Sequence, residues 1–241
     1  LAEFFHAAGI LLLEGYGLTE TAAVSTLNVP GDFRFGSVGK PLPNVDVTID
    51  EDGEILVRGE SVMREYHGMP EETAEAIEAD TGWFHTGDIG KFDRDGFLHI
   101  TGRKKELIVT AGGKNVPPAH IERRLLESDF ITGAVLYGDG RAFISALVAP
   151  SKQLAHWAAG KGIPFESMED LVERQECIDR IQKEVDEINA SLPSYESVRR
   201  VALAPRPFSA EEGEVTPTGK LRRDRIIENF HDRLDALYDA G

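Results

Sequence analysis

The sequence predicts an α/β protein of the α+β kind, with a β-rich lobe followed by a lobe that mixes helices and strands. Residues 30–100 contain short runs of alternating hydrophobic residues separated by Gly and Asp turns, and longer helical patterns follow later in the chain. Between them, residues 102–106 combine a glycine with charged side chains. Because glycine frees the backbone and charges stay in water, we interpret this segment as an exposed joint between two lobes. A charged hairpin tip is the alternative.

The composition is that of a folded, acidic protein. The 241 residues are 41% hydrophobic and carry a formal net charge of −16, which argues against nucleic acid as a partner and leaves room for a local basic patch. The single cysteine, Cys177, excludes an internal disulfide and fits a reducing compartment, so we expect a cytoplasmic protein. No apolar run is long enough to span a membrane. The negative charge also argues against an anionic membrane as a partner of the whole surface, which leaves room for peripheral membrane contact at a local patch.

The first residues predict a helix followed by a buried strand. Apolar residues within Leu1–Ala8 and the glycine after them indicate the last turns of a helix, and its start at Leu1 without a methionine suggests a fragment. The continuous apolar run Ile10–Leu13 predicts a strand covered on both faces. It leads into the glycine-flanked polar loop 15–21, the kind of place where α/β proteins bind ligands. A plain turn at a strand end is the alternative, and no dinucleotide fingerprint is present.

The β-rich lobe is expected to contain two hairpins and a short helix. Residues 45–49 and 55–57 alternate around the turn Asp52-Gly53, and Asp95-Gly96 sets up a second hairpin. Between the hairpins, proline and acidic residues at the start of 70–79 predict a short helix.

The later part of the chain predicts helices around a strand pair. Pro117-Pro118 opens a helix, and residues 134–137 and 142–148 are expected to pair around a Gly-Asp-Gly turn. Residues 167–170 form a capping box, and the apolar stripe 178–188 recurs at helical spacing, which indicates core packing.

Two charged residues stand in glycine-containing loops. Asp88 lies within Gly82–Gly90, where a turn aspartate is the ordinary interpretation. Lys220 lies in Pro217–Leu221, just before a terminal helix whose inward residues are Ile227, Phe230, Leu234 and Leu237. Residues 220–225 include four basic side chains and one acid, so they form either a solvated helix start or a phosphate-binding patch.

Several catalytic patterns are absent from the sequence. No two histidines are spaced four residues apart, as a helical zinc site requires. There is no Gly-x-Ser-x-Gly elbow and no complete Gly-x-x-x-x-Gly-Lys-Ser/Thr phosphate loop.

Six short motifs occur in one order along the chain. They are Gly15-Tyr16-Gly17-Leu18-Thr19-Glu20, Gly36-Ser37-Val38-Gly39-Lys40-Pro41, Gly82-Trp83-Phe84-His85-Thr86-Gly87-Asp88, Gly102-Arg103-Lys104-Lys105-Glu106, Gly112-Gly113-Lys114-Asn115 and Pro217-Thr218-Gly219-Lys220. In this order they resemble the C-terminal half of an adenylate-forming acyl-CoA synthetase. The Gly113-Lys114-Asn115 motif and the long helical insert 151–190 are most similar to the long-chain fatty-acid branch.

The resemblance implies a two-domain organisation. Residues 1–102 would be the β-barrel-like end of the large AMP-binding domain, and residues 103–241 would be the small, mobile α/β lid domain. The family's phosphate loop and most of its large domain would lie upstream of Leu1, so we expect this chain alone to be inactive.

The resemblance also implies a chemistry and its cofactors. A carboxylate reacts with ATP and Mg²⁺ to give acyl-AMP, and coenzyme A then displaces AMP. Gly15, Tyr16 and Gly17 would belong to the ATP site, with Tyr16 stacking on adenine. Thr19 would contact phosphate and the metal, and Glu20 would hold Mg²⁺, since a hard cation prefers carboxylate oxygens.

The remaining motifs are expected to complete the site. Asp88 would accept hydrogen bonds from the ribose hydroxyls beside Arg103. Lys220 would reach the α-phosphate during the first step, and Lys105 would be the hinge of the lid. Gly112 and Gly113 would line the pantetheine path.

Two departures and three alternatives accompany the resemblance. Val109 stands where some relatives carry lysine, and Glu65-Tyr66 stands where relatives often have Gly-Tyr. An adenylating enzyme for an aromatic acid, one for an amino acid, and a non-catalytic nucleotide-binding or interaction fragment are the alternatives to a fatty-acid ligase.

Overall fold

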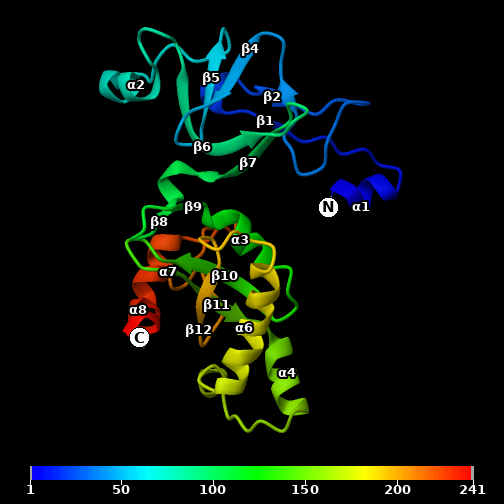
Figure 1. The fold of residues 1–241 in the computed structure, drawn as a ribbon, viewed down its shortest axis with the longest axis vertical. Coiled ribbons are helices and arrows are strands. Elements are labelled where there is room, and N and C mark those ends of the chain that lie inside the picture. The colour runs from blue at the N-terminus through cyan, green and yellow to red at the C-terminus, as the bar shows by residue number, and fades with distance from the viewer. Residues whose placement is uncertain (1, 240–241) are drawn as a thin grey trace. The chain divides into compact units, whose positions relative to one another are not determined.

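The computed structural model describes residues 2–239, which divide into two compact units between Glu106 and Leu107 (Figure 1). Each unit mixes helices and strands, which confirms the predicted α+β class. The predicted domain boundary lies after residue 102, four residues before this division. The identity of the two domains stays a prediction.

The N-terminal unit consists of two antiparallel sheets with short helices beside them. The first sheet has the order β1-β2-β3 and the second the order β4-β5-β6-β7. Its strands are β1 (Gly15–Tyr16), β2 (Thr26–Leu27), β3 (Lys40–Pro41), β4 (Val45–Ile49), β5 (Glu54–Gly59), β6 (Phe84–Phe92) and β7 (Leu98–Arg103). Its helical elements are α1 (Ala2–Ala7), α2 (Pro70–Ala76) and the 3₁₀ turns η1 (Thr19–Thr21) and η2 (Lys104–Glu106).

Both predicted hairpins are present. Strands β4 and β5 pair with Val47 opposite Val57, and β6 and β7 pair around the Asp95-Gly96 turn. Gly53 and Gly96 have φ values of 90° and 82°, in the left-handed region that glycine adopts without strain. The inward residues of these hairpins form one core with the ring of Tyr16 from the other sheet, so the core joins the first motif to the β4–β7 sheet.

Three predictions about this unit are corrected. Residues Ile10–Leu13 form no strand, and Ile10 is 52% exposed, because no neighbouring strand within residues 2–239 pairs with them. Helix α2 ends at Ala76, and Ile77 is already extended. Asp88 is not a turn residue, because it lies inside β6 opposite Arg103.

The charged hairpin tip proposed for residues 102–106 is also absent. Strand β7 pairs with β6, whereas β8 (Ile108–Val109) pairs with β9 (Asn115–Val116), so the two β-type runs do not pair with each other. The turn η2 connects them and ends at Glu106, where the two compact units divide. This agrees with the interpretation of the segment as a joint.

The C-terminal unit is built on a three-stranded sheet with the order β10-β11-β12. Strands β10 (Ile131–Tyr137) and β11 (Ile144–Pro150) are antiparallel, as predicted, and β12 (Val198–Leu203) is parallel to β11. The helices are α3 (Pro118–Leu125), α4 (Lys152–Gly160), α5 (Met168–Leu171), α6 (Gln175–Asn189), α7 (Arg223–Asn229) and α8 (His231–Asp239).

Helices cover both faces of this sheet (Figure 1). Along β11, Ala146 and Val148 pack into one core with α3 and α6, whereas Leu147 and Ala149 pack into a second core with α7 and α8. The alternation follows the two-residue period of a strand. The predicted stripe on α6 is confirmed as core packing, since its Ile181 and Val185 are fully buried.

The terminal helix differs from its prediction in one respect. It is interrupted at Phe230, which separates α7 from α8. The predicted inward residues still pack against the second core, and Leu234 is fully buried. Among residues 2–239, no helix has both the length and the apolar character needed to cross a lipid bilayer.

Candidate functional site

Three of the residues singled out from the sequence meet in the N-terminal unit. Tyr16 donates its hydroxyl hydrogen to Asp88 Oδ2 at 2.7 Å, and Arg103 Nε donates to Asp88 Oδ1 at 2.8 Å. Strand β1 supplies the tyrosine, β6 the carboxylate and β7 the guanidinium, which lies directly opposite Asp88 in the ladder. Residues separated by 72 positions in the sequence thus form one polar group.

Burial and hydrogen bonding set the electrostatics of this group. Tyr16 and Asp88 are 7% and 5% exposed, whereas the Arg103 side chain is 43% exposed. Burial is the main cause that raises the pKa of Tyr16 above its usual range, and the neighbouring Asp88 carboxylate adds to it. The phenol therefore stays protonated and donates to the carboxylate. The carboxylate oxygens retain acceptor capacity, because each can accept more than one hydrogen bond.

The aromatic ring of Tyr16 lies in the core with Val45, Ile55 and Leu98. This burial leaves little of the ring face open in the present structure. The stacking of Tyr16 on adenine stays a prediction, whereas its contact with Asp88 is a feature that the sequence did not reveal.

Thr86 supports the same carboxylate from within β6. Its hydroxyl accepts from the backbone N–H of Asp88 at 3.1 Å and donates to the carbonyl of Ile55 at 2.7 Å. The motif containing Thr86 was recognised in the sequence, but this residue was not assigned a role. Its position two residues before Asp88, on the same face of the strand, was the available signal.

The loop after β1 is shaped by close backbone packing. A Cβ atom at Gly17 would lie 1.3 Å from the carbonyl oxygen of Ala23, so only glycine fits there. Ala22 and Ala23 have φ values of 52° and 100°, which non-glycine residues rarely adopt. Strained backbone of this kind persists only when the surrounding structure holds it, and it is common at binding sites.

Glu20 and Thr19 lie on η1 in this loop. Glu20 is half-buried and its Oε1 accepts a hydrogen bond from Tyr66 at 3.1 Å, so Tyr66 of the unusual Glu65-Tyr66 pair contacts the predicted metal ligand. Thr19 is exposed.

Residues 2–239 contain no cluster of three or more His, Cys, Asp or Glu side chains that could hold a metal ion. A single carboxylate fits Mg²⁺, which is commonly held by one or two carboxylates together with substrate phosphates.

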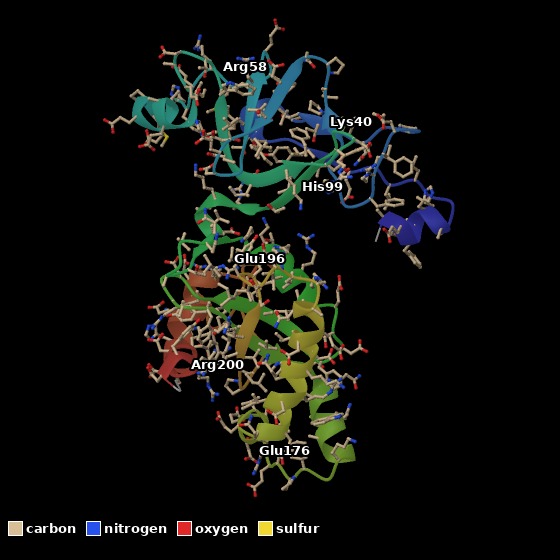
Figure 2. The ribbon with its side chains drawn as sticks, in the orientation of Figure 1. Lys40, Arg58, His99, Glu176, Glu196 and Arg200 are labelled. Atoms are coloured by element: carbon tan, nitrogen blue, oxygen red, sulfur yellow. The ribbon has the colours of Figure 1, made fainter. Side chains whose placement is uncertain are left out.

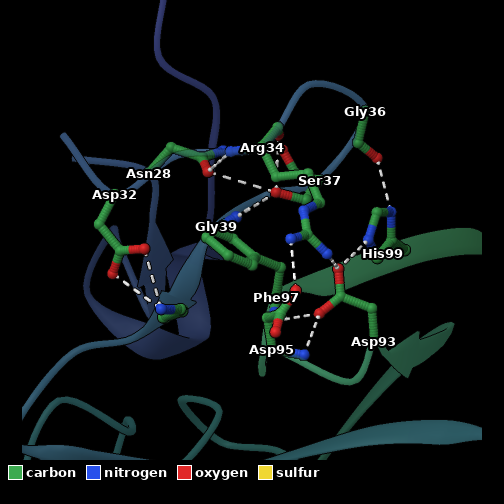
Figure 3. A network of polar contacts seen from close by, with 11 residues as sticks. Asn28, Asp32, Arg34, Gly36, Ser37, Gly39, Asp93, Asp95, Phe97 and His99 are labelled. Atoms are coloured by element: carbon green, nitrogen blue, oxygen red, sulfur yellow. Dashed lines mark hydrogen bonds and ion pairs between the residues drawn. The ribbon is translucent and has the colours of Figure 1, made fainter. Parts of the chain in front are cut away.

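A polar network around Asp93 fixes the loop that carries the second motif (Figure 3). Asp93 accepts hydrogen bonds from Arg34 and from His99 Nε2, and His99 Nδ1 faces the carbonyl of Gly36 at 3.0 Å. Burial opposes ionisation of Asp93, but its donors hold its pKa well below the usual range. Arg34 also lies over the Phe97 ring, 4.8 Å from its centroid. We interpret this network as structural.

A second charged contact connects β4 and β5 to the segment before β6. Arg58 lies on β5 (Figure 2). It pairs with Asp46 Oδ2 at 2.8 Å, and its guanidinium carbon lies 4.4 Å from the Trp83 ring centroid. This contact fixes the start of the motif that ends at Asp88.

The joint between the units contains two adjacent lysines with different surroundings. Lys104 Nζ lies 2.6 Å from Asp52 Oδ2 and 2.8 Å from Glu54 Oε2. These two carboxylates raise the pKa of Lys104 above its usual range. Lys105, the predicted hinge, is exposed, and its side chain forms no hydrogen bond or ion pair among the described residues.

Gly112 and Gly113 lie in the turn between β8 and β9 of the C-terminal unit. Gly113 has a φ of 71°, and its N–H donates to Thr110 at 2.8 Å. A Cβ at Gly113 would meet nothing within 4 Å among the described residues, so the turn presents open backbone on its outer side.

Lys220 lies at the end of a tight turn that begins at Thr216. Thr216 N–H donates to the Lys220 carbonyl at 2.8 Å, the Thr216 hydroxyl accepts from Lys220 N–H at 3.0 Å, and Val215 and Leu221 form a β-bridge below it. The Lys220 side chain is exposed. The turn is therefore a small β-hairpin rather than an irregular loop.

The base of this hairpin is anchored by Glu214, whose side chain is fully buried. Its carboxylate accepts from Arg206 at 2.7 and 2.8 Å and from Asn229 at 2.9 Å, and its backbone carbonyl accepts from Arg222 N–H at 2.7 Å. Burial opposes ionisation of Glu214, but these donors lower its pKa to about 2. The helix that follows the hairpin is also held, because Arg223 at the start of α7 forms a bidentate pair with Glu122 of α3 at 2.7 and 2.8 Å.

The structure thus brings Tyr16, Asp88 and Arg103 together and places Glu20 on the following turn of the same unit. Lys220 and the Gly112-Gly113 turn belong to the C-terminal unit. Within that unit they lie in separate hairpins.

Comparison with known families identifies the chain. The sequence model of the AMP-binding enzyme C-terminal domain matches residues 105–241, which is more than half of the chain, and that of the AMP-binding enzyme matches residues 1–67. The chain therefore belongs to the AMP-binding enzyme family, as its motifs indicated.

Its curated relatives are considerably longer. Long-chain-fatty-acid--CoA ligase FadD15 of Mycobacterium tuberculosis is 40% identical over 246 residues, which cover 99% of this chain and 40% of the relative. Long-chain-fatty-acid--CoA ligase ACSBG1 of Mus musculus is 34% identical and is covered to 36% of its length. This chain therefore spans about 40% of the length of the FadD15 relatives.

Solved structures share the fold. The A domain of the carboxylic acid reductase from Segniliparus rugosus, in complex with AMP and a co-purified carboxylic acid, has a TM-score of 0.74 at 22% identity, with 99% of this chain and 37% of that chain covered. The O-succinylbenzoate coenzyme A synthetase from Bacillus subtilis, in complex with AMP, has a TM-score of 0.64 at 25% identity, with 92% and 42% covered.

Proposed function

We propose that this chain is the C-terminal part of an ATP-dependent acyl-CoA ligase acting on a long-chain fatty acid. The observation that carries the proposal is the buried Tyr16–Asp88–Arg103 group in a chain of the AMP-binding enzyme family. A buried carboxylate beside a half-exposed guanidinium suits the recognition of ribose hydroxyls, which donate to the carboxylate and accept from the guanidinium. The names of the relatives at 40% identity favour fatty acids as substrates.

In the first proposed step, a carboxylate oxygen of the fatty acid attacks the α-phosphorus of ATP. A new acyl C–O–P linkage forms, the bond to the bridging oxygen breaks, and pyrophosphate leaves. Asp88 and Arg103 hold the ribose, and Thr19 contacts phosphate. Lys220 supplies a positive charge where negative charge is redistributed in the transition state. Glu20, together with Thr19, would hold Mg²⁺, which lowers the repulsion between phosphate groups when bound.

In the second proposed step, the sulfur of coenzyme A attacks the acyl carbon. The carbon–sulfur bond forms, the thiol loses its proton, and AMP leaves with the former carboxylate oxygen. The chain turns at Lys105 between the two steps, so that the Gly112-Gly113 turn replaces Lys220 near the reacting group. The open space beside Gly113 supports this role, because a side chain there would stand in the path of the pantetheine arm.

The domain roles follow from this proposal. We assign residues 1–102 to the end of the AMP-binding domain and residues 103–241 to the mobile lid. A cytoplasmic location, with or without contact at a membrane surface, fits a fatty-acid substrate and a single cysteine, Cys177, that is buried.

A ligase for another carboxylate is the second candidate, and one observation favours it. The solved structures with this fold include an anthranilate CoA ligase and the O-succinylbenzoate enzyme, so the fold also serves aromatic acids.

The test is acid-dependent exchange of pyrophosphate into ATP by the full-length protein, with fatty acids, aromatic acids and amino acids compared side by side. We expect exchange with long-chain fatty acids. Preferred exchange with an aromatic or amino acid would replace the substrate assignment, and no exchange with any acid would overturn the ligase proposal. Binding of AMP to the 241-residue chain, measured by calorimetry, tests the nucleotide site separately.

A further inference from the structure

A second buried carboxylate, Glu54, lies next to the proposed nucleotide site and is not used by the mechanism above. It stands at the start of β5, and its side chain is 3% exposed. Its Oε1 accepts from the backbone N–H of Gly87 at 2.8 Å, and its Oε2 lies 3.0 Å from His85 Nδ1 and 2.8 Å from Lys104 Nζ. A buried carboxylate with this many donors is held in one geometry.

The partners of Glu54 flank both members of the Asp88–Arg103 pair. Gly87 immediately precedes Asp88 on β6, and Lys104 immediately follows Arg103 at the end of β7. One side chain therefore fixes the backbone beside the carboxylate and the backbone beside the guanidinium. Gly87 has a φ of 71°, so the N–H that Glu54 binds belongs to a residue in the left-handed region.

Charged groups around Glu54 keep it ionised. Burial alone would raise the pKa of Glu54, but the hydrogen bonds from His85, Lys104 and Gly87 lower it below its usual value. His85 faces a second carboxylate, Glu78 Oε1, at 3.1 Å, and its pKa is raised, first by Glu54. An imidazolium can donate to both carboxylates at once.

The contrast between Lys104 and Lys105 shows where this anchoring stops. Lys104 is bound by Asp52 and Glu54, both from the β4–β5 turn and the start of β5. The next residue, Lys105, is exposed, and its side chain forms no hydrogen bond or ion pair among residues 2–239. The anchored part of the joint thus ends at Lys104, two residues before the division between the compact units.

We propose that Glu54 is a positioning residue that holds Asp88 and Lys104 at the same time, so that the chain turns at Lys105 without disturbing the ribose-binding pair. The functional half of this inference rests on the proposed roles of Asp88 and Lys105. Its structural half, a carboxylate that orders both segments, is independent of any activity.

The structural half is tested by hydrogen–deuterium exchange on the 241-residue chain. Glu54→Gln keeps the size of the side chain and removes the charge, and Lys104→Met removes the ammonium group. We expect exchange of the amides at 104–107 to rise about tenfold or more in both variants, as loss of a hydrogen bond to a charged group implies. The amides at 86–88 should respond to Glu54→Gln only.

Glu51→Gln, an exposed carboxylate on the same turn, and Lys91→Met, an exposed lysine on β6, are the matched controls and should change neither segment. Amides of β10 in the other unit serve as an internal reference for folding. Unchanged exchange at both 86–88 and 104–107 in Glu54→Gln would overturn the proposal. So would a uniform rise across the whole N-terminal unit in both variants, which a merely stabilising ion pair predicts.

The functional half is tested in the full-length protein by the KM for ATP in acyl-adenylate formation. We expect Glu54→Gln to raise this KM about fivefold or more while thioester formation from supplied acyl-AMP falls less, because Asp88 is displaced. A lowered melting temperature with an unchanged KM would overturn the positioning role. If the wild-type protein adenylates no acid, the proposed function fails, and the exchange measurements then decide the structural role of Glu54 alone.

Discussion

The hydroxyl of Tyr16 lies 2.7 Å from Asp88 Oδ2, and this hydrogen bond connects the first motif of the chain to the third. The two side chains are contributed by different sheets, and the Tyr16 ring packs into the core of the β4–β7 sheet. Without the Tyr16 donor, the buried Asp88 carboxylate would keep its hydrogen bond from Arg103, but Oδ2 would lose its side-chain donor. The bond therefore affects both the stability of the unit and the position of the carboxylate.

We predict that Tyr16→Phe lowers the free energy of unfolding of the N-terminal unit by about 1–3 kcal/mol, the usual effect of leaving a buried acceptor without its donor. Denaturation can be followed by the fluorescence of Trp83 in a Trp157→Phe background, since each unit contains one of the two tryptophans. Glu51→Gln, at an exposed residue of the same unit, should change stability by less than about 0.5 kcal/mol. A Tyr16→Phe value as small as that of the control would contradict the prediction.

Asp88→Ala in the full-length protein should raise the KM for ATP about tenfold or more, because a hydrogen bond to a charged group is worth roughly 1.5–3 kcal/mol. Initial rates of adenylation at varied ATP concentration measure this. Glu51→Ala, at an exposed carboxylate of the β4–β5 turn, is the control and should leave the KM unchanged. An unaltered KM and rate in Asp88→Ala would reduce Asp88 to a structural residue of β6.

The sequence predicted those elements whose signals are local. Asp-Gly turns at 52–53 and 95–96 specified two hairpins, and the stripe 178–188 specified a core helix. Strand β12 was not predicted, because Arg199 and Arg200 interrupt its apolar pattern and its partner β11 lies about 50 residues earlier. The run Ile10–Leu13 has the composition of a buried strand, but composition cannot supply the neighbouring strands that bury it.

The site was predicted only as far as its motifs extended. Asp88 and Arg103 were recognised, but the buried position of the Tyr16 ring and the role of Glu54 depend on contacts between residues 31 to 72 positions apart. An isolated acid at the start of an apolar strand was the one signal for Glu54. A single sequence contains no information on which donors will surround such an acid.

Lys105→Pro is expected to impair thioester formation more than adenylation. Proline fixes φ and removes an N–H group, so it would stiffen the joint at the residue where the lid is proposed to turn. A misplacement of about 1 Å can reduce a rate by up to about 10²-fold, and we expect a loss of roughly this size in the second step. Single-turnover assays of each step provide the measurement. Lys105→Ala changes the charge but not φ and should have a smaller effect, and equal losses in both steps would refute the hinge assignment.

Stability should fall in acid partly through Glu214. The pKa of Glu214 is about 2 in the folded protein and 4.5 as the ordinary value, and this difference corresponds to roughly 3 kcal/mol. Because the folded-state pKa is the lower one, this stabilisation is present above pH 4.5 and is lost as the pH falls toward 2. Glu214→Gln should therefore lower stability at neutral pH and flatten its decline between about pH 5 and pH 2. An unchanged pH dependence, with exposed Glu211→Gln as the reference, would contradict this assignment.

Lys220→Ala in the full-length protein should block adenylation and largely spare thioester formation. Lys220 stands on a hairpin whose base is fixed by Glu214 and by the Arg223–Glu122 pair, so its side chain is exposed while its backbone is held. Because the backbone is held, only the side-chain torsions of Lys220 remain to be ordered when the ammonium group contacts a substrate.

Removing one preorganised electrostatic partner typically costs 10²–10³ in rate, or about 3–4 kcal/mol, and we expect a loss of this size in the formation of acyl-AMP from acid and ATP. Thioester formation from supplied acyl-AMP and coenzyme A should change far less, because the lid would then have turned Lys220 away. Arg222→Ala, at an exposed cation two residues further on, tests whether any positive charge on this hairpin suffices, and we expect it to retain adenylation. Normal adenylation in Lys220→Ala, or equal damage to both steps, would mean that Lys220 is a solvated helix-start lysine, whose removal costs well under about 1 kcal/mol.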